Sequence, residues 1–277
     1  MQHSPIRYPG GKSRAVKILD KFIPDDVTRV VSPFFGGGSF ENFLAKQGKE
    51  VIGYDLCDPL VCFWQAYLNR KDEVFSRAKE MSRLILADKY WDVDKGSPER
   101  EEQRELYFGW RDRALNDPDP FERGLHYLAL NRCAFSGMTL ISGPRTSKWI
   151  ASQFSISALE NLEKVIFDVK SVDHLSCFDS VEKHREDFLY LDPPYIMETE
   201  KKEGIYGEDG DLHRGFDHEK LKDILSKHEG RWVLSYLDVL RTRELYEDFN
   251  ITNVNWTYGM KPGKDRPQGA EVVITNF

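Results

Sequence analysis

The eight residues Phe188-Leu189-Tyr190-Leu191-Asp192-Pro193-Pro194-Tyr195 are the most informative segment of this chain. An apolar run that stops at an acidic residue predicts a buried strand of a parallel sheet. Each proline fixes φ and lacks an N–H, so the carbonyls of Asp192 and Pro193 stay available as acceptors. Together with the stacking face of Tyr195, the Asp192 carboxylate and the Pro193 carbonyl suit the exocyclic amine of a planar base. A simple strand-ending turn is the alternative interpretation.

Four other short runs of apolar or β-branched residues predict further strands, at residues 28–31, 50–54, 165–169 and 232–236. Helical patterns lie between them, at residues 40–47 and 156–164 and in a helix that Asp217 caps and that runs to Ser226. This alternation predicts an α/β fold with a mostly parallel, doubly wound sheet. Residues 251–258 and 271–276 flank a loop rich in Pro, Gly and Lys, which predicts an antiparallel C-terminal hairpin at the edge of the sheet.

Residues 56–154 interrupt this alternation. They contain no convincing strand pattern, whereas residues 74–89 and 100–115 have apolar residues at helical spacing. We therefore expect two units. Residues 1–55 and 155–277 form the sheet-containing domain, and residues 56–154 form an inserted, mainly helical domain.

The composition limits the class of protein. Thirty-nine Lys and Arg against 46 Asp and Glu leave a net charge of −7, which excludes a protein that binds polyanions with its whole surface. No apolar run is long enough for a membrane span and the N-terminus has no signal-peptide pattern, so we expect a cytoplasmic protein without membrane contact. The four cysteines form no C-x-x-C pair, and we expect reduced structural thiols and no metal site.

The segment Ser32-Pro33-Phe34-Phe35-Gly36-Gly37-Gly38-Ser39-Phe40 follows a predicted strand and opens a predicted helix. Such a loop lets the backbone approach a ligand closely. It is not a dinucleotide fingerprint, because Glu41 stands where the third glycine of G-x-G-x-x-G is required. Asp55 follows at the end of the next strand and suits a pair of ribose hydroxyls. A tight turn followed by an unrelated Asp is the alternative.

The N-terminal segment Tyr8-Pro9-Gly10-Gly11-Lys12-Ser13 has the ending of a P-loop. A P-loop would need glycine at Ile6 and a preceding strand, so a nucleotide phosphotransferase is disfavoured. A flexible glycine pair that presents a lysine could cover a small ligand, or it could be an N-terminal turn.

In this order, the three motifs resemble the Dam-like (D12 class, alpha-type) DNA adenine-N6 methyltransferases. The resemblance implies a Rossmann-like, S-adenosylmethionine-dependent methyltransferase fold with an inserted target-recognition domain. It also implies that Asp192 and Pro193, in a turn that Pro194 helps to fix, hold the amine of a flipped adenine on which Tyr195 stacks. The donor pocket that it implies is lined by Tyr8, Lys12, Phe34, Gly36, Gly38, Asp55, Asp192 and, near the donor's adenine, Asp173.

Residues 127–138 resemble the L-N-R-x-x-Y/F-N-G block of the same family. The resemblance implies that Phe135 and Ser136 wedge into DNA beside the vacated base. The DNA-contacting residues that we expect from this block and from the basic clusters are Asn131, Arg132, Phe135, Ser136, Met138, Arg145, Lys148, Lys261, Lys264 and Arg266. Leu140 stands where the GATC-reading branch has arginine, and Ser32 stands where relatives have an acidic residue.

The function that we expect is methyl transfer from S-adenosylmethionine to adenine N6 in a short sequence of double-stranded DNA. The protein is expected to act as a monomer, with a restriction endonuclease as a functional rather than physical partner. N4-cytosine methylation and a catalytically dead DNA-binding relative are the alternatives.

Overall fold

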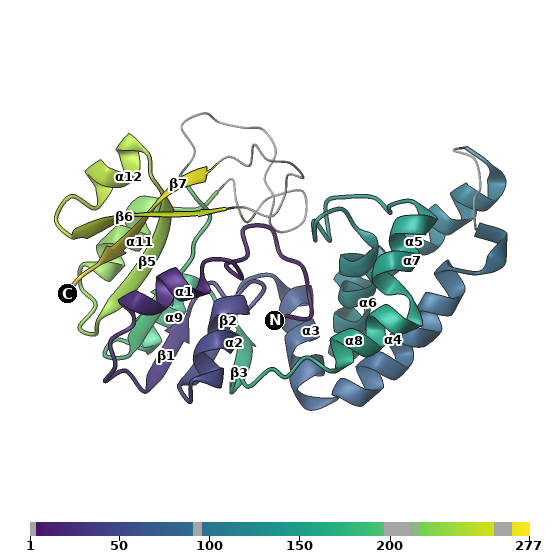
Figure 1. Ribbon diagram of the computed structural model, residues 1–277, viewed down its shortest axis with the longest axis horizontal. Coiled ribbons are helices and arrows are strands. Elements are labelled where there is room, and N and C mark those ends of the chain that lie inside the picture. The colour runs from purple at the N-terminus through teal and green to yellow at the C-terminus, as the bar shows by residue number, and fades with distance from the viewer. Residues whose placement is uncertain (1–3, 91–95, 197–211, 213–214, 258–267) are drawn as a thin grey trace.

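The computed structural model describes residues 4–90, 96–196, 212, 215–257 and 268–277. It has two halves that lie side by side (Figure 1). One half holds a β-sheet with helices on its faces, and the other consists of helices. The chain passes from the sheet half into the helical half after its second strand and returns before its third.

The sheet has seven strands among the described residues, in the order β3-β2-β1-β4-β5-β7-β6. The first five strands in this order pair in parallel, and the last two form an antiparallel hairpin at one edge. Both the α/β class and the C-terminal edge hairpin are therefore confirmed. The strands are β1 (Arg29–Ser32), β2 (Glu50–Asp55), β3 (Ser171–His174), β4 (Phe188–Leu191), β5 (Trp232–Leu237), β6 (Asn250–Thr257) and β7 (Gln268–Thr275).

One predicted strand was wrong. Residues 165–169 form no strand, and β3 begins only at Ser171. Val165 and Val169 are buried, so the apolar pattern correctly indicated burial. However, the Val165 carbonyl accepts hydrogen bonds from Tyr67 Oη at 2.9 Å and Lys71 Nζ at 2.8 Å, so side chains rather than a neighbouring strand satisfy it.

The order of the strands creates a switch point between β1 and β4. From β1 the chain extends the sheet through β2 to β3, and it then returns to place β4 and β5 on the other side of β1. The loops that follow β1 and β4 therefore leave in opposite directions. In open parallel sheets a ligand-binding crevice forms at this position, outside the carboxyl ends of the strands.

The two faces of the sheet bury separate cores, because neighbouring residues of a strand point to opposite faces. Val30 belongs to one apolar cluster and Val31 to the other. The helices that contribute to the Val30 cluster are α1 (Val16–Leu19), α2 (Ser39–Lys46) and α3 (Asp58–Asn69). The helices that contribute to the Val31 cluster, or pack partly buried side chains against it, are α9 (Cys177–Lys183), α11 (His218–Leu225) and α12 (Leu240–Leu245).

The helical half contains α4 (Lys71–Ile85), α5 (Pro98–Asn116), α6 (Pro120–Cys133), α7 (Ser147–Phe154) and α8 (Ile156–Glu163). Among the residues that the structure describes there are also two short 3₁₀ turns, η1 (Asp20–Phe22) and η2 (Asp88–Tyr90). Side chains of Ser97, Asp119, Thr146 and Ser155 accept N-cap hydrogen bonds at the starts of α5, α6, α7 and α8.

Helix α3 contacts both halves, whereas α8 packs within the helical half. From α3, Gln65 Nε2 donates to the Val172 carbonyl of β3 at 3.1 Å, while the same helix packs along α6. Helix α8 lies beside α4, where Lys79 and Glu163 form an ion pair of 2.8 Å. The domain boundaries at residues 55/56 and 154/155 stay a prediction.

The remaining sequence expectations concern cysteines and membranes. All four cysteines are buried free thiols, as expected. Within the described ranges, no helix is long and apolar enough to cross a membrane.

Candidate active site

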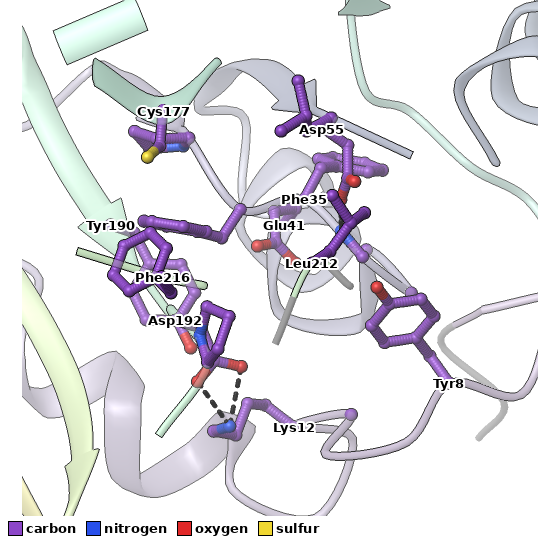
Figure 2. Close-up of a pocket in the computed structure, with 18 of the residues that line it drawn as sticks. Tyr8, Lys12, Phe35, Glu41, Asp55, Cys177, Tyr190, Asp192, Leu212 and Phe216 are labelled. Atoms are coloured by element: carbon purple, nitrogen blue, oxygen red, sulfur yellow. Dashed lines mark hydrogen bonds and ion pairs between the residues drawn. The ribbon is translucent and has the colours of Figure 1, made fainter. Parts of the chain in front are cut away.

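A cavity of about 270 Å³ lies at the switch point of the sheet, outside the carboxyl ends of β1, β2 and β4 (Figure 2). Several parts of the chain that are distant in sequence form its walls. They are the N-terminal segment around Tyr8 and Lys12, the glycine loop after β1, the ends of β2 and β4, residues 176–178, and residues 212 and 215–217.

The glycine loop shapes one wall. Gly36 and Gly38 have φ values of +50° and +60°, in the left-handed region that favours glycine. A Cβ at Gly36 would lie 2.7 Å from Tyr8 Cε1, and one at Gly38 would lie 2.7 Å from Phe35 Cε1. Side chains at these positions would therefore displace the aromatic rings that pack under the loop. Trp64 Nε1 also anchors the loop by donating to the Gly36 carbonyl at 3.0 Å.

Asp55 ends β2 and is buried, with 9% of its surface exposed. Its Oδ2 accepts from the Gly36 N–H at 2.8 Å, and its Oδ1 accepts from the Cys57 N–H at 2.9 Å. Burial raises the pKa of the Asp55 carboxyl, and these backbone hydrogen bonds oppose the rise. Each oxygen keeps a further lone pair, so the carboxylate can still accept from two neighbouring hydroxyl groups of a ligand.

Asp192 ends β4 and forms an ion pair with Lys12, which comes from 180 residues earlier in the chain. Lys12 Nζ lies 2.6 Å from both carboxylate oxygens, and Ser235 Oγ donates to Asp192 Oδ1 at 2.9 Å. Lys12 is 5% exposed and the Asp192 side chain 20%. The lysine thus pairs with the carboxylate and fixes its orientation in the wall of the cavity.

The rest of the Asp-Pro-Pro-Tyr turn lies beside this ion pair. Pro194 lines the cavity, whereas Pro193 is buried. The Tyr195 ring centre is 5.1 Å from Lys12 Nζ, and its hydroxyl donates to Glu271 Oε2 at 2.7 Å. Tyr195 is therefore held in place next to the ion pair, although it is not among the residues that line the cavity.

A group of aromatic rings forms part of the cavity wall. Phe216 stacks on Phe178 at a centroid distance of 5.9 Å and meets Phe34 edge-on at 5.5 Å. All three residues line the cavity. These rings can accept a flat apolar ring system, and other residues of the wall offer carboxylates.

Sequence reasoning missed Glu41 as a site residue. Glu41 stands at the third position of α2, is 4% exposed and lines the cavity. Ser32 Oγ donates to its Oε1 at 2.8 Å, and burial raises the pKa of the Glu41 carboxyl from 4.5 to about 7. The signal available in the sequence was a charged residue between Phe40 and Leu44 on the buried face of a short helix.

The predicted donor-pocket residues are largely brought together. Tyr8, Lys12, Phe34, Gly36, Gly38, Asp55 and Asp192 all line the same cavity. Asp173 is not among them. It is exposed on β3, where Gln65 Nε2 approaches it at 3.5 Å, because β2 separates β3 from the switch point.

The predicted DNA-contacting residues divide into buried and exposed groups. Asn131 is fully buried and bonds both the N–H and the carbonyl of Arg7, at 3.0 and 2.7 Å. Arg132 is 6% exposed and donates to the backbone and side chain of Gln153. Neither side chain is presented at the surface, so both act in this structure as internal supports.

Phe135, in contrast, is 39% exposed, directly before Ser136, which has a φ of +50°. The guanidinium of Arg145 lies 4.9 Å from the Phe135 ring centre and 5.6 Å from that of Trp149, and Arg7 covers Trp149 at 5.0 Å. Cations and rings thus alternate on this surface, which suits phosphates and stacked bases.

The other predicted contacts have varied positions. Lys148 is exposed and Met138 is half-buried. Leu140, at the position of the GATC-reading arginine, is 5% exposed and part of the apolar core. Lys261, Lys264 and Arg266 lie outside the described residues.

Comparison with known proteins identifies relatives of the whole chain. Residues 8–260 match the family described as D12 class N6 adenine-specific DNA methyltransferase. Type II methyltransferase M1.LlaDCHI of Lactococcus lactis subsp. cremoris is 24% identical, covering 98% of this chain and 94% of the relative. The DNA adenine methylase of Haemophilus influenzae is 23% identical, and the match covers 92% of this chain and 86% of that protein. Modification methylase StsI of Streptococcus sanguinis is 23% identical, and the match covers 99% of this chain but 43% of that protein.

Proposed function

The chain belongs to the D12 class N6 adenine-specific DNA methyltransferase family, and on this premise we propose that its cavity binds S-adenosylmethionine beside Asp192. Membership makes the protein an adenine-specific DNA methyltransferase and implies S-adenosylmethionine as methyl donor and DNA as substrate. The observation that carries the proposal is the position of Asp192, which lines the same cavity as the glycine loop and Asp55. A methyl donor in this cavity and an amine at Asp192 would be neighbours.

The residues of the cavity fit this donor. Phe34, Phe178 and Phe216 offer apolar rings to an adenine, and the two oxygens of Asp55 can accept from the hydroxyls of a ribose. The left-handed glycines leave the loop without side chains where the ligand must approach the backbone.

The chemistry at Asp192 follows from its hydrogen bonds. Oδ1 accepts from Lys12 and Ser235, whereas the described partner of Oδ2 is Lys12, so Oδ2 has a lone pair for the substrate amine. With the Pro193 carbonyl as second acceptor, both amine hydrogens are held and electron density on N6 rises. When bound, S-adenosylmethionine supplies a methyl group on a sulfonium, a good leaving group, so the protein need not form a covalent intermediate. Asp192 orients the amine and accepts a proton once N6 becomes acidic.

We further propose that residues 56–154, which include Phe135, Ser136, Met138, Arg145 and Lys148, form the target-recognition domain, and that Lys261, Lys264 and Arg266 add basic contacts. The alternating rings and cations around Phe135 support this assignment. The target adenine must leave the duplex, because N6 inside a base pair is not accessible to the donor. We propose residues 56–154 as this domain and residues 1–55 with 155–277 as the catalytic domain, with Tyr195 stacking on the extruded base.

The biological setting is part of the same proposal. The protein would act in the cytoplasm as a monomer on double-stranded DNA, with a restriction endonuclease of the same specificity as functional partner. The names of two relatives, a Type II methyltransferase and a modification methylase, support this role.

The test of the proposed function is methylation of unmodified genomic DNA with S-adenosylmethionine, followed by nucleoside analysis and long-read mapping of modified bases. We expect N6-methyladenine within one short sequence, and far less modification by an Asp192→Asn protein at the same enzyme concentration and reaction time. N4-methylcytosine, or no methylation by folded protein that binds the donor, would contradict the proposal.

Replacing Phe135 with alanine tests the DNA surface. We expect kcat/KM on duplex DNA to fall about tenfold, because the exposed ring no longer fills the space left by the extruded base, which costs a few kcal/mol to unstack. The deficit should shrink on a duplex in which the target adenine is mismatched, since that base is already easier to extrude.

Phe277→Ala is the matched control, because Phe277 is 44% exposed and is the C-terminal residue, which Figure 1 marks beside the sheet, on the other side of the molecule from α6. Two results would show that Phe135 does not wedge into DNA. One is an equal fall in kcat/KM in the two variants, and the other is a Phe135→Ala fall in kcat/KM that is the same on matched and mismatched duplexes.

A further inference from the structure

The acidic side chains that line the cavity differ in how their charge is compensated. Asp192 is neutralised by Lys12, and Asp55 is held by two backbone N–H groups. Asp217 is exposed and caps α11 by accepting from the Lys220 N–H. Glu41 is buried, and within the described part of the chain the neutral hydroxyl of Ser32 and the backbone of Glu41 itself hydrogen-bond to its carboxyl group. Glu41 is therefore a deeply buried carboxyl group whose described hydrogen-bond partners are neutral.

This arrangement places a carboxyl group where it can face a ligand. Glu41 extends from the first turn of α2, directly after the glycine loop, and Figure 2 shows it among the residues that surround the cavity. A first-turn Glu that only interacts with the helix dipole is normally solvated. A buried carboxyl group is costly unless a positive charge meets it, so its position in the cavity indicates a cationic ligand.

We propose that Glu41 recognises the positive charge of the methyl donor and that it releases a proton when the donor binds. This inference rests on the proposed function, in which the ligand is S-adenosylmethionine. That donor has two positively charged groups, a sulfonium and an ammonium, and one negatively charged carboxylate, so its net charge is positive. A cation beside Glu41 favours its ionised form, whereas the cavity without the cation favours the protonated form.

The groups around Glu41 determine the pH range of this exchange. The other titratable residues that line the cavity are Tyr8, Lys12, Asp55, Cys177, Tyr190, Asp192 and Asp217. Burial raises the pKa of Cys177 to about 12 and that of Tyr190 well above its usual value, so neither titrates near neutrality. Burial has the largest effect and raises the pKa of the Glu41 carboxyl to about 7, against the hydrogen bonds from its own backbone and from Ser32, which lower it. The charge of Asp192 raises this pKa further, and that of Lys12 lowers it.

The sign of the pH effect follows. Below about pH 7, Glu41 is protonated without donor and must lose its proton on binding, so the donor Kd rises about tenfold for each pH unit of acidification. Well above pH 7 the carboxylate is already ionised, and its contribution to the Kd becomes independent of pH.

The experiment is calorimetry of S-adenosylmethionine binding to the full-length protein, at several pH values in pairs of buffers that differ in ionisation enthalpy. We expect release of about one proton at pH 6 and almost none at pH 8.5. Glu41→Gln keeps an acceptor for Ser32 but cannot ionise. This variant should bind the donor more weakly than the wild type at pH 8.5 and release about one proton fewer at pH 6. Its donor Kd should also lose the pH dependence that Glu41 causes.

Two further variants separate this role from a structural one. Ser32→Ala removes the hydrogen bond that stabilises the ionised form of Glu41, so the pH at which half a proton is released should move upward. Glu99→Gln is the matched control, because Glu99 is an exposed acidic residue in the first turn of α5. This variant should release protons as the wild type does.

The outcomes distinguish the two proposals. Donor binding without proton release, or release that is unchanged in Glu41→Gln, would overturn the role of Glu41 and leave the proposed function intact. Absence of donor binding by every protein would refute the donor assignment itself. With S-adenosylhomocysteine, which keeps the ammonium but lacks the sulfonium, unchanged release assigns the contact to the ammonium and reduced release assigns it to the sulfonium. Both results support recognition of a cation.

Discussion

Asp192→Asn is expected to lower kcat for adenine methylation by about 10³-fold, in the range found when a preorganised electrostatic contact is removed from an active site. Asparagine has nearly the same shape, but it carries no charge and presents one N–H₂ group where the substrate amine needs an acceptor. It also leaves the buried Lys12 ammonium without its carboxylate partner. Single-turnover methylation of duplex DNA with saturating donor measures the effect.

Asp173→Asn is the control for this substitution. Asp173 also lies on a parallel strand of the sheet, but it is exposed and outside the cavity, so its replacement should leave the rate within about twofold. Methylation by Asp192→Asn at a rate near that of the wild type would show that Asp192 does not hold the reacting amine.

Asp55→Asn is expected to weaken binding of S-adenosylmethionine about 100-fold. Each Asp55 oxygen accepts one backbone N–H, from Gly36 or Cys57. The amide group of asparagine would direct hydrogens at one of them, which costs about 1–3 kcal/mol for the unsatisfied donor. That cost is the same with and without bound S-adenosylmethionine, so the change in Kd comes from the lost hydrogen bond between the charged acceptor and a ligand hydroxyl. Such a bond contributes about 1.5–3 kcal/mol, and its upper end corresponds to about two powers of ten in Kd.

Calorimetric titration with the donor at pH 8 measures this effect, with Asp173→Asn again as control. At that pH the titration of Glu41 contributes little, so the loss reports on Asp55. A Kd within threefold of the wild-type value in folded Asp55→Asn protein would place the hydroxyl-binding carboxylate elsewhere.

Much of the fold was predictable because the central strands are short, apolar and followed by polar residues. Residues 28–31, 50–54, 188–191 and 232–236 all correspond to strands of the sheet. The failure at residues 165–169 has a specific cause. Apolar periodicity indicates burial but not which groups satisfy the backbone. Here side chains of α3 and α4 donate hydrogen bonds to the Val165 carbonyl, in place of the backbone N–H of a neighbouring strand.

The limits of prediction for the DNA surface have a similar origin. Asn131 and Arg132 are polar residues in a motif, and such residues are usually exposed. In the structure they are buried. Asn131 of α6 hydrogen-bonds to the backbone of Arg7 in the N-terminal segment, and Arg132 of α6 hydrogen-bonds to the Gln153 carbonyl of α7. Phe135, Arg145 and their neighbours, which follow the end of the helix, instead form a surface that DNA can reach.

Local sequence was sufficient wherever a residue's role depends on its immediate neighbours in the chain. It identified the glycine loop, Asp55 at a strand end and the Asp-Pro-Pro-Tyr turn, because backbone freedom and strand termination are local properties. The pairing of Lys12 with Asp192 across 180 residues and the burial of Glu41 beside Ser32 depend on how the strands are ordered in the sheet. Strand order brings distant chain segments to one switch point, and the burial that results there determines the charge of Glu41.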